Sequence, residues 1–392
     1  MGLNLAFVSM HTSPASVPGS GDAGGMNVVE RAQAVWLAKR GHRVELITRR
    51  ADPEQPDLME LEPGVFLRHL DGGPRTPLPK SVIDSHIPEF ASGLAQLRDF
   101  DLVHSNHWMS GVAALPWARH EGIPHVQSYH SVAALPNSPL SDGEPPESEA
   151  RVAGEAFCAR ESDAIVAISA AEAHTAIERC GADPGKVHIV WPGVDHALFT
   201  PEGAIEQVRP YLLFAARLQP LKGPELVIRA LAQVPQVIRP RLLIAGDVSE
   251  DFAPYEAQLH ELVDELGLTG MVEFIGPQPR DQLAELMRSA TLMLVPSHSE
   301  TFGLVALEAA ASGTPVVAAS AGGLREAVVH LETGHLLDSR EPEDWGRAIT
   351  MLLSDPVRLT MMGIVSRVHA LRFEWRAAAA KLESLYYYLI DG

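Results

Sequence analysis

The chain has 392 residues, of which 46% are hydrophobic and 21% are charged, and this composition excludes a wholly disordered or fibrous protein. Its 31 basic and 50 acidic residues give a net charge of −19, which disfavours unassisted binding to nucleic acid or to an anionic membrane. The two cysteines, Cys158 and Cys180, make neither a disulfide framework nor a metal ligand set, which is typical of a cytoplasmic protein with reduced thiols. The first residues lack the basic segment that begins a signal peptide, so we expect no signal peptide. No run approaches the roughly 18 apolar residues of a membrane-spanning helix, so we expect no membrane insertion.

Short apolar runs alternate with longer amphipathic runs through the first half of the chain. One amphipathic run, at 26–40, ends at Gly41, a residue type that often terminates helices. The alternation predicts a parallel sheet with crossover helices. We expect its strands at 5–10, 43–48, 66–70, 101–105, 125–128, 164–168 and 187–190.

This pattern breaks at 192–210, where prolines and glycines occur without a period, and a second alternating series follows. The fold class is therefore predicted as α/β, with two doubly wound Rossmann-like domains facing each other across a cleft. In such sheets, ligands bind beyond the carboxyl ends of the strands. We place the first domain at 1–195, a linker at 196–204 and the second domain at 205–371. The second series has expected strands at 211–215, 241–245, 272–275, 292–295 and 315–318, and terminal helices at 345–353 and 375–389.

A glycine-rich loop at 19–25 joins the first expected strand to the first expected helix. Backbone N–H groups and the helix dipole favour an anion at such a position. The glycine spacing fits neither the dinucleotide motif nor a P-loop. The loop is interpreted as an anion or substrate contact, with a flexible turn as the alternative.

Two cations, Arg217 and Lys222, directly follow the expected strand at 211–215. Their place at the carboxyl end of a strand suggests a clamp for a diphosphate. Hydrogen bonds to charged groups are worth about 1.5–3 kcal/mol each, and Arg can bind phosphate through two of them. Solvated loop cations remain the alternative.

Glu300 and Glu308 follow the expected strand at 292–295. Carboxylates accept hydrogen bonds from sugar hydroxyls, so the pair could hold a sugar and a ribose. The alternative is that neither residue binds a ligand, with Glu300 placed at a helix start by the helix dipole and Glu308 on the protein surface.

His130, just beyond another strand end, is a candidate for substrate contact or a packed histidine. The histidine spacings match no strong zinc pattern, and Asp99-Phe100-Asp101 lies at the opposite end of its strand, so no catalytic metal is expected.

Taken together, Gly24-Gly25-Met26-Asn27, Arg217 with Lys222, and the segment from Glu300 to Glu308 resemble the motifs of the retaining family-4 glycosyltransferases of the GT-B fold. The resemblance covers nearly the whole chain and implies a C-terminal crossover helix at 372–392 that returns to the first domain. Segments 9–14, 146–151 and 218–224 are similar to segments of the family members that act in the actinobacterial mycothiol pathway, here called the mycothiol branch. Members of this branch move N-acetylglucosamine from a UDP donor to inositol phosphate. The alternative is a paralogue for antibiotic assembly, as in lincosamide biosynthesis, where a related enzyme joins a GDP-octose to the thiol ergothioneine.

The resemblance implies a role for each motif. The catalytic positions are the diphosphate ligands Arg217 and Lys222, the sugar ligand Glu300, and His130 against the transferred sugar. The donor-binding positions are Gly24, Gly25, Gln278, Gly303 and the ribose ligand Glu308. The acceptor-binding positions are Asn27, His107, Ser131 and the phosphate ligands Lys80 and Arg151. The chain departs from the mycothiol branch at His107 and Ser131, where Tyr and Thr are expected, at Pro136, where Lys is expected, and at Gln278, where some members carry Arg.

We therefore expect a metal-independent transfer with retention, without a cofactor, in which the leaving diphosphate takes the acceptor proton. The expected partners are a small-molecule donor and acceptor, without nucleic acid or membrane insertion, and a homodimer is left open together with the nucleotide and the sugar. A nucleotide-sugar epimerase and a non-catalytic sugar-nucleotide sensor remain as alternatives. A nicotinamide-dependent oxidoreductase is disfavoured because the dinucleotide glycine pattern is absent.

Overall fold

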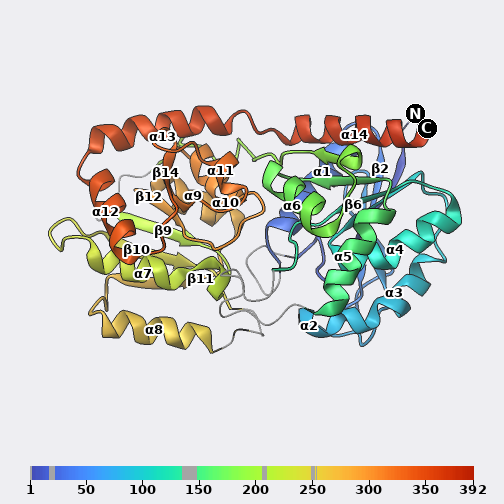
Figure 1. The fold of residues 1–392 in the computed structure, drawn as a ribbon, viewed down its shortest axis with the longest axis horizontal. Helices are drawn as coiled ribbons and strands as arrows, with labels where there is room; N and C mark the ends of the chain where they lie inside the picture. The colour runs from blue at the N-terminus through green and yellow to red at the C-terminus, as the bar shows by residue number, and fades with distance from the viewer. Residues whose placement is uncertain (1, 17–22, 135–147, 205–209, 249–251, 253) are drawn as a thin grey trace.

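Two sheets of mainly parallel strands, each accompanied by helices, lie side by side and account for the shape of the molecule (Figure 1). The computed structural model describes residues 2–16, 23–134, 148–204, 210–248, 252 and 254–392. The expected loop residues 19–22 and the departure at Pro136 lie outside these described residues. The α/β fold class is confirmed by the strand order of the two sheets.

The first sheet runs in the order β3-β4-β2-β1-β5-β6-β7-β8. Neighbouring strands are parallel, except for β3, which pairs antiparallel with β4 at the edge. The strands are β1 (Asn4–Ser9), β2 (Arg43–Arg49), β3 (Leu58–Glu62), β4 (Val65–Leu70), β5 (Leu102–Asn106), β6 (His125–Ser128), β7 (Ala164–Ala167) and β8 (Val187–Ile189). The helices are α1 (Gly25–Ala38), α2 (Lys80–Ile83), η1 (Asp84–His86), α3 (Ile87–Leu94), α4 (Trp108–Glu121), α5 (Glu149–Glu161), α6 (Ala170–Cys180) and η3 (Pro184–Lys186).

The second sheet is parallel throughout and runs in the order β11-β10-β9-β12-β13-β14. Its strands are β9 (Tyr211–Ala215), β10 (Arg241–Ala245), β11 (Val272–Gly276), β12 (Leu292–Val295), β13 (Val316–Ala319) and β14 (Gly334–Leu337). The helices are η4 (Pro220–Lys222), α7 (Pro224–Gln233), α8 (Tyr255–Glu265), α9 (Arg280–Ser289), α10 (Leu304–Ala311), α11 (Leu324–Ala327), α12 (Pro342–Leu353), α13 (Pro356–Ala370) and α14 (Trp375–Asp391).

The last two helices connect the two halves of the molecule. α13 covers the second half, and α14 continues across to lie beside α1 in the first half (Figure 1). The Tyr386 hydroxyl of α14 lies 2.6 Å from Nδ1 of buried His104 on β5, which anchors the helix. The helix begins at Trp375 rather than at residue 372, because residues 371–374 form a turn and a short extended link. No single helix of the described chain has the length and apolar composition to cross a membrane, whereas α12 and the segment Pro356–Asp391 satisfy both criteria only as a pair bent by 96°.

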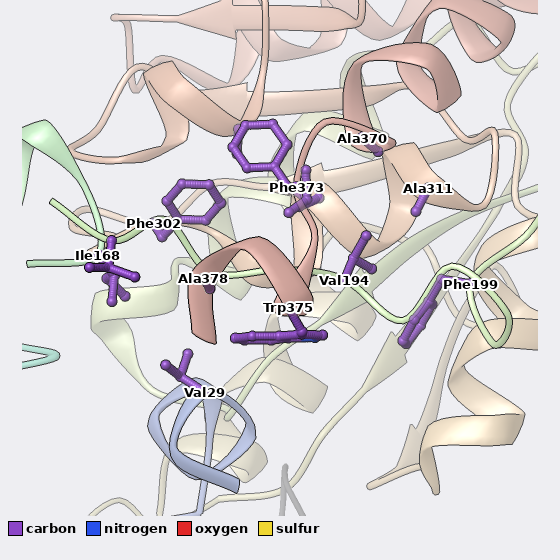
Figure 2. Packing of buried hydrophobic residues seen from close by; sticks show 14 of the residues in the cluster. Val29, Ile168, Val194, Phe199, Phe302, Ala311, Ala370, Phe373, Trp375 and Ala378 are labelled. Carbon is purple, nitrogen blue, oxygen red and sulfur yellow. The ribbon is translucent and has the colours of Figure 1, made fainter. Parts of the chain in front are cut away.

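A continuous apolar cluster packs where the two halves meet (Figure 2). The rings of Phe302, which precedes α10, and Phe373, which precedes α14, lie 5.6 Å apart in an edge-on arrangement. Trp375 lies beside them in the same cluster, together with Val29 of α1 and Val194 after β8 (Figure 2). Burial of this apolar surface therefore couples the C-terminal crossover to both sheets.

The expected strands agree with the structure to within two residues at each end. Three elements were not expected from the sequence: β3, β14 and α13. No strand or helix lies between β8 and β9 in the described residues, which is where the linker at 196–204 was expected. The domain limits at 195 and 205 stay predictions.

Candidate active site

One cavity of about 830 Å³ lies between the carboxyl ends of the two sheets. Side chains and backbone from both halves of the chain line it. The structure brings every residue of the expected site to this cavity: Gly24, Gly25, Asn27, Lys80, His107, His130, Ser131, Arg151, Arg217, Lys222, Gln278, Glu300, Gly303 and Glu308. Their individual roles remain predictions, but their convergence is a property of the fold.

The glycine loop at the start of α1 approaches the second half of the molecule closely. A Cβ added at Gly25 would lie 3.3 Å from Cδ1 of Leu304, so a side chain here would press against α10. Asn27 is 2% exposed and shapes the loop, since its Oδ1 accepts from the Gly24 N–H at 2.9 Å and its Nδ2 donates to the Ser13 carbonyl at 2.8 Å. The structure thus gives Asn27 a loop-forming role, and its expected contact with the acceptor stays a prediction.

The end of the cavity that the second half of the chain lines carries an ion pair. Lys222 of η4 donates from Nζ to Oε1 of Glu300 at 2.5 Å, and the same oxygen accepts from Oγ of Ser297 at 2.9 Å. Glu300 is thereby held beside the cation expected to bind diphosphate. Gly303 has a φ of +93° and turns the chain into α10, where an added Cβ would lie 2.5 Å from Cδ2 of Leu324.

Arg280 is a site residue that the sequence analysis missed. It begins α9 and donates from Nη2 to Oε1 of Glu308 at 2.8 Å. Its position just after β11 is a signal of the same kind that identified Arg217 after β9. Nearby Gln278 donates from Nε2 to the carbonyls of Ile275 and Gly276. Its side-chain oxygen is therefore the atom with which it can accept a hydrogen bond from the nucleobase of the expected donor.

The end of the cavity that the first half of the chain lines is basic. Lys80 begins α2, and Arg151 lies on α5 with 9% of its surface exposed. Arg151 donates from Nη2 to Oγ of Ser131 at 3.2 Å and from Nε to Oε1 of Glu155 at 2.9 Å. These bonds fix the guanidinium plane at the edge of the cavity, where it can meet a phosphate.

Two stacked imidazoles, His11 and His107, lie beside these cations with their ring centroids 4.2 Å apart. Burial lowers the pKa of both rings well below the usual value, and the positive charges of Lys80 and Arg151 lower it further. Within the described residues, Nδ1 of His11 and both ring nitrogens of His107 lack a hydrogen-bond partner. His11 was not among the residues expected at the site, although its place beyond the end of β1 could have identified it.

His130 lines the cavity where the two halves of the chain meet. Its backbone carbonyl accepts from Oγ1 of Thr301 at 2.6 Å, a bond between the two halves of the chain. Its Nε2 lies 2.8 Å from Oδ1 of Asn106, and burial lowers the pKa of the ring to about 4. The imidazole is therefore neutral at physiological pH.

No group of three or more His, Cys, Asp or Glu side chains is placed to hold a metal ion in the described part of the chain. His104 and His125 are buried in the first sheet, where His104 bonds to Oγ of Ser128 and His125 to Oγ of Ser105, both at 2.9 Å. A reaction that needs neither a metal nor a cofactor stays a prediction.

Two family descriptions match the chain, "Glycosyl transferases group 1" over residues 198–367 and "Glycosyl transferase 4-like domain" over residues 24–193. The D-inositol 3-phosphate glycosyltransferase of Stackebrandtia nassauensis is 39% identical over 401 residues, covering 97% of this chain and 90% of the relative. The enzyme of the same name from Catenulispora acidiphila is 40% identical over 405 residues, covering 99% and 96%. Among solved structures, sucrose-phosphate synthase from Thermosynechococcus elongatus superimposes with a TM-score of 0.91 at 28% identity, covering 99% of each chain. Anabaena HepE in complex with UDP-glucose shares the fold, with a TM-score of 0.75 at 20% identity, covering 99% of this chain and 100% of that chain.

Proposed function

The chain belongs to the glycosyltransferases with group 1 and 4-like domains, and we propose that it moves a sugar from a nucleoside-diphosphate sugar to a phosphorylated cyclitol. The observation that carries the acceptor assignment is the convergence of Lys80, Arg151 and His107 at one end of the cavity. Cations and imidazole N–H groups are suited to phosphate oxygens, and neighbouring hydroxyl and amide groups are suited to a polyol. D-inositol 3-phosphate, named in the relatives that are about 39% identical, has this chemistry.

The donor is proposed to bind at the other end of the cavity. Arg217 and Lys222 would hold the diphosphate, and Glu300 would accept hydrogen bonds from sugar hydroxyls. The Lys222–Glu300 ion pair supports this arrangement, because it sets the phosphate ligand and the sugar ligand side by side. Glu308, oriented by Arg280, would accept from the two ribose hydroxyls.

The proposed reaction is a front-side transfer with retention. The bond from the anomeric carbon to the diphosphate oxygen breaks, the bond to the acceptor oxygen forms on the same face, and the leaving diphosphate takes the acceptor proton. Arg217 and Lys222 stabilise the charge that grows on the diphosphate, a kind of stabilisation that typically contributes about 10²–10³ in turnover per donor. Glu300 is paired with Lys222 and Ser297, which supports its role as a sugar ligand rather than a nucleophile.

The alternative, a GDP-octose:ergothioneine transferase of lincosamide type, is favoured by the departures from the mycothiol branch at His107, Ser131, Pro136 and Gln278. We would first titrate the protein with UDP and with GDP and follow the melting temperature, because a ligand at 100 times its Kd stabilises by about 2.7 kcal/mol. Product formation is then measured by mass spectrometry with UDP-N-acetylglucosamine and inositol 3-phosphate, with inositol as the control acceptor. Stabilisation by UDP and product only with the phosphorylated acceptor support the proposal. Stabilisation by GDP alone, with product from a thiol acceptor, would overturn it.

We further propose that the protein is cytoplasmic and that two copies pair through α13. Four exposed apolar residues on this helix and one just beyond its end are spaced alternately by four and three: Val357, Met361, Ile364, Val368 and Leu371. This is the spacing of a helix that pairs with another helix, and an antiparallel pair about a two-fold axis would bring this row of one copy against the same row of the other. Ile364→Glu should give monomers in size-exclusion chromatography with light scattering, whereas Val237→Glu, a control that is 97% exposed elsewhere, should not. A wild-type protein that is monomeric at all concentrations would refute the pairing.

A further inference from the structure

A buried hydrogen-bonded chain runs from α1 through β5 to the cavity. Glu30 on α1 and Asn106 at the end of β5 are both fully buried. Asn106 donates from Nδ2 to Oε1 of Glu30 at 3.2 Å, and its Oδ1 lies 2.8 Å from Nε2 of His130. Glu30 and Asn106 are not part of the expected site, and the two lie 76 residues apart in the sequence.

The chemistry of these groups gives the chain a direction. Burial raises the pKa of Glu30 to about 8, yet the carboxyl offers an acceptor oxygen whether it is protonated or ionised. In the structure Asn106 turns its donor end toward Glu30 and its acceptor end toward His130. A carbonyl oxygen only accepts, so the hydrogen of the neutral imidazole must lie on Nε2.

The opposite ring nitrogen is consequently an acceptor. Nδ1 of His130 is buried and has no hydrogen-bond partner in the described residues, and His130 lines the cavity. We propose that Glu30 and Asn106 are positioning residues, which hold His130 as the Nε2–H tautomer so that its Nδ1 accepts a hydrogen bond from a hydroxyl of the transferred sugar. The identity of that sugar rests on the proposed function, but the tautomer does not.

The proposal predicts a specificity. A bare ring nitrogen binds an O–H or N–H donor and is left unpaired by a deoxy sugar, and sites that hydrogen-bond a substrate hydroxyl discriminate strongly against its absence. With the other tautomer, the ring would instead present an N–H group, which suits an ether or phosphate oxygen.

The first test reads the tautomer directly by long-range ¹H–¹⁵N NMR of histidine-labelled protein, with the His130 signal assigned from its loss in His130→Gln. We expect a protonated Nε2 and a bare Nδ1 in the wild type. Glu30→Gln keeps an acceptor oxygen for Asn106 and should keep this signature, whereas Glu30→Met removes the acceptor, frees the amide to turn and should give mixed tautomers. A protonated Nδ1 in the wild type overturns the proposal.

The second test measures kcat/KM for the donor in the same variants. We expect a loss of about tenfold in Glu30→Met and recovery to near wild type in Glu30→Gln. Gln33→Met is the matched control, because Gln33 is buried on the same helix with both amide atoms unpartnered in the described residues. It should leave both the His130 signature and kcat/KM unchanged. Mixed tautomers in Glu30→Met with unchanged kcat/KM would refute the catalytic part of the inference, and absence of any transfer by the wild type would instead refute the proposed function.

Discussion

The buried carboxyl of Glu30 makes the stability of the fold depend on pH in a predictable direction. Burial raises its pKa from 4.5 to about 8, so the folded state holds a proton that the unfolded chain releases. An acid with a raised pKa favours folding fully below its unfolded pKa, and this contribution is lost as the pH rises toward the folded pKa. Glu30→Gln has the same shape and no titration, so it isolates this contribution.

The size of the effect follows from the two pKa values. At about 1.4 kcal/mol per pKa unit, the full difference corresponds to about 5 kcal/mol, of which about 3.5 kcal/mol falls between about pH 5 and pH 8. Glu172, whose pKa burial raises to about 7, is present in both proteins and cancels in the comparison.

The assay is thermal or denaturant unfolding of the wild type and Glu30→Gln at about pH 5, 6.5 and 8. The free energy of unfolding of the variant relative to the wild type should rise with pH by a few kcal/mol. Gln33→Met, which removes no titrating group, should differ from the wild type by the same amount at every pH. A relative stability of Glu30→Gln that is constant or falls with pH would refute the reasoning.

Three further predictions concern the cavity and the crossover helix. Arg217→Ala should lower kcat by about 10²–10³ with an unchanged melting temperature, and unchanged turnover would remove Arg217 from the diphosphate site. Burial keeps the pKa of His11 and His107 well below the usual value, so both rings should stay neutral between about pH 6.5 and 8 and add no pH dependence to the KM for a phosphorylated acceptor. The wild type and His107→Tyr should therefore show the same pH profile, and a profile that changes in His107→Tyr would contradict this reasoning. Tyr386→Phe leaves Nδ1 of buried His104 without its partner and should lower stability by about 1–3 kcal/mol with little change in kcat; an unaltered melting temperature would show that this bond does not anchor α14.

Most of the parallel strands could be predicted from the sequence because both of their faces are covered. A strand buried on both sides is a short continuous apolar run, and the segment that became β12, Leu292–Val295, is an example. β3 lies exposed at the sheet edge and carries two glutamates in five residues, so the same rule missed it. α13 was missed for a different reason. It has apolar residues on its buried face, such as Met362, and on its exposed face, such as Ile364, so no amphipathic period stands out.

The location of the candidate site could also be predicted, because a residue just after a parallel strand must lie at the carboxyl edge of its sheet. Arg217 after β9 and Glu300 after β12 are both in this position, and they line the same cavity. That inference needs only local sequence and the rule that ligands gather at this edge. It holds whatever partners the side chains later acquire.

Which partner each side chain has, and whether its charge is solvated, was decided only by the tertiary structure. Glu30 is an ordinary helical glutamate in the sequence, yet folding seals it beside Asn106 and raises its pKa to about 8. Lys222 and Glu300, 78 residues apart, become an ion pair in the same way. Local sequence determines where a group lies along its own strand or helix, whereas burial and hydrogen bonding depend on distant segments that only the folded chain brings together.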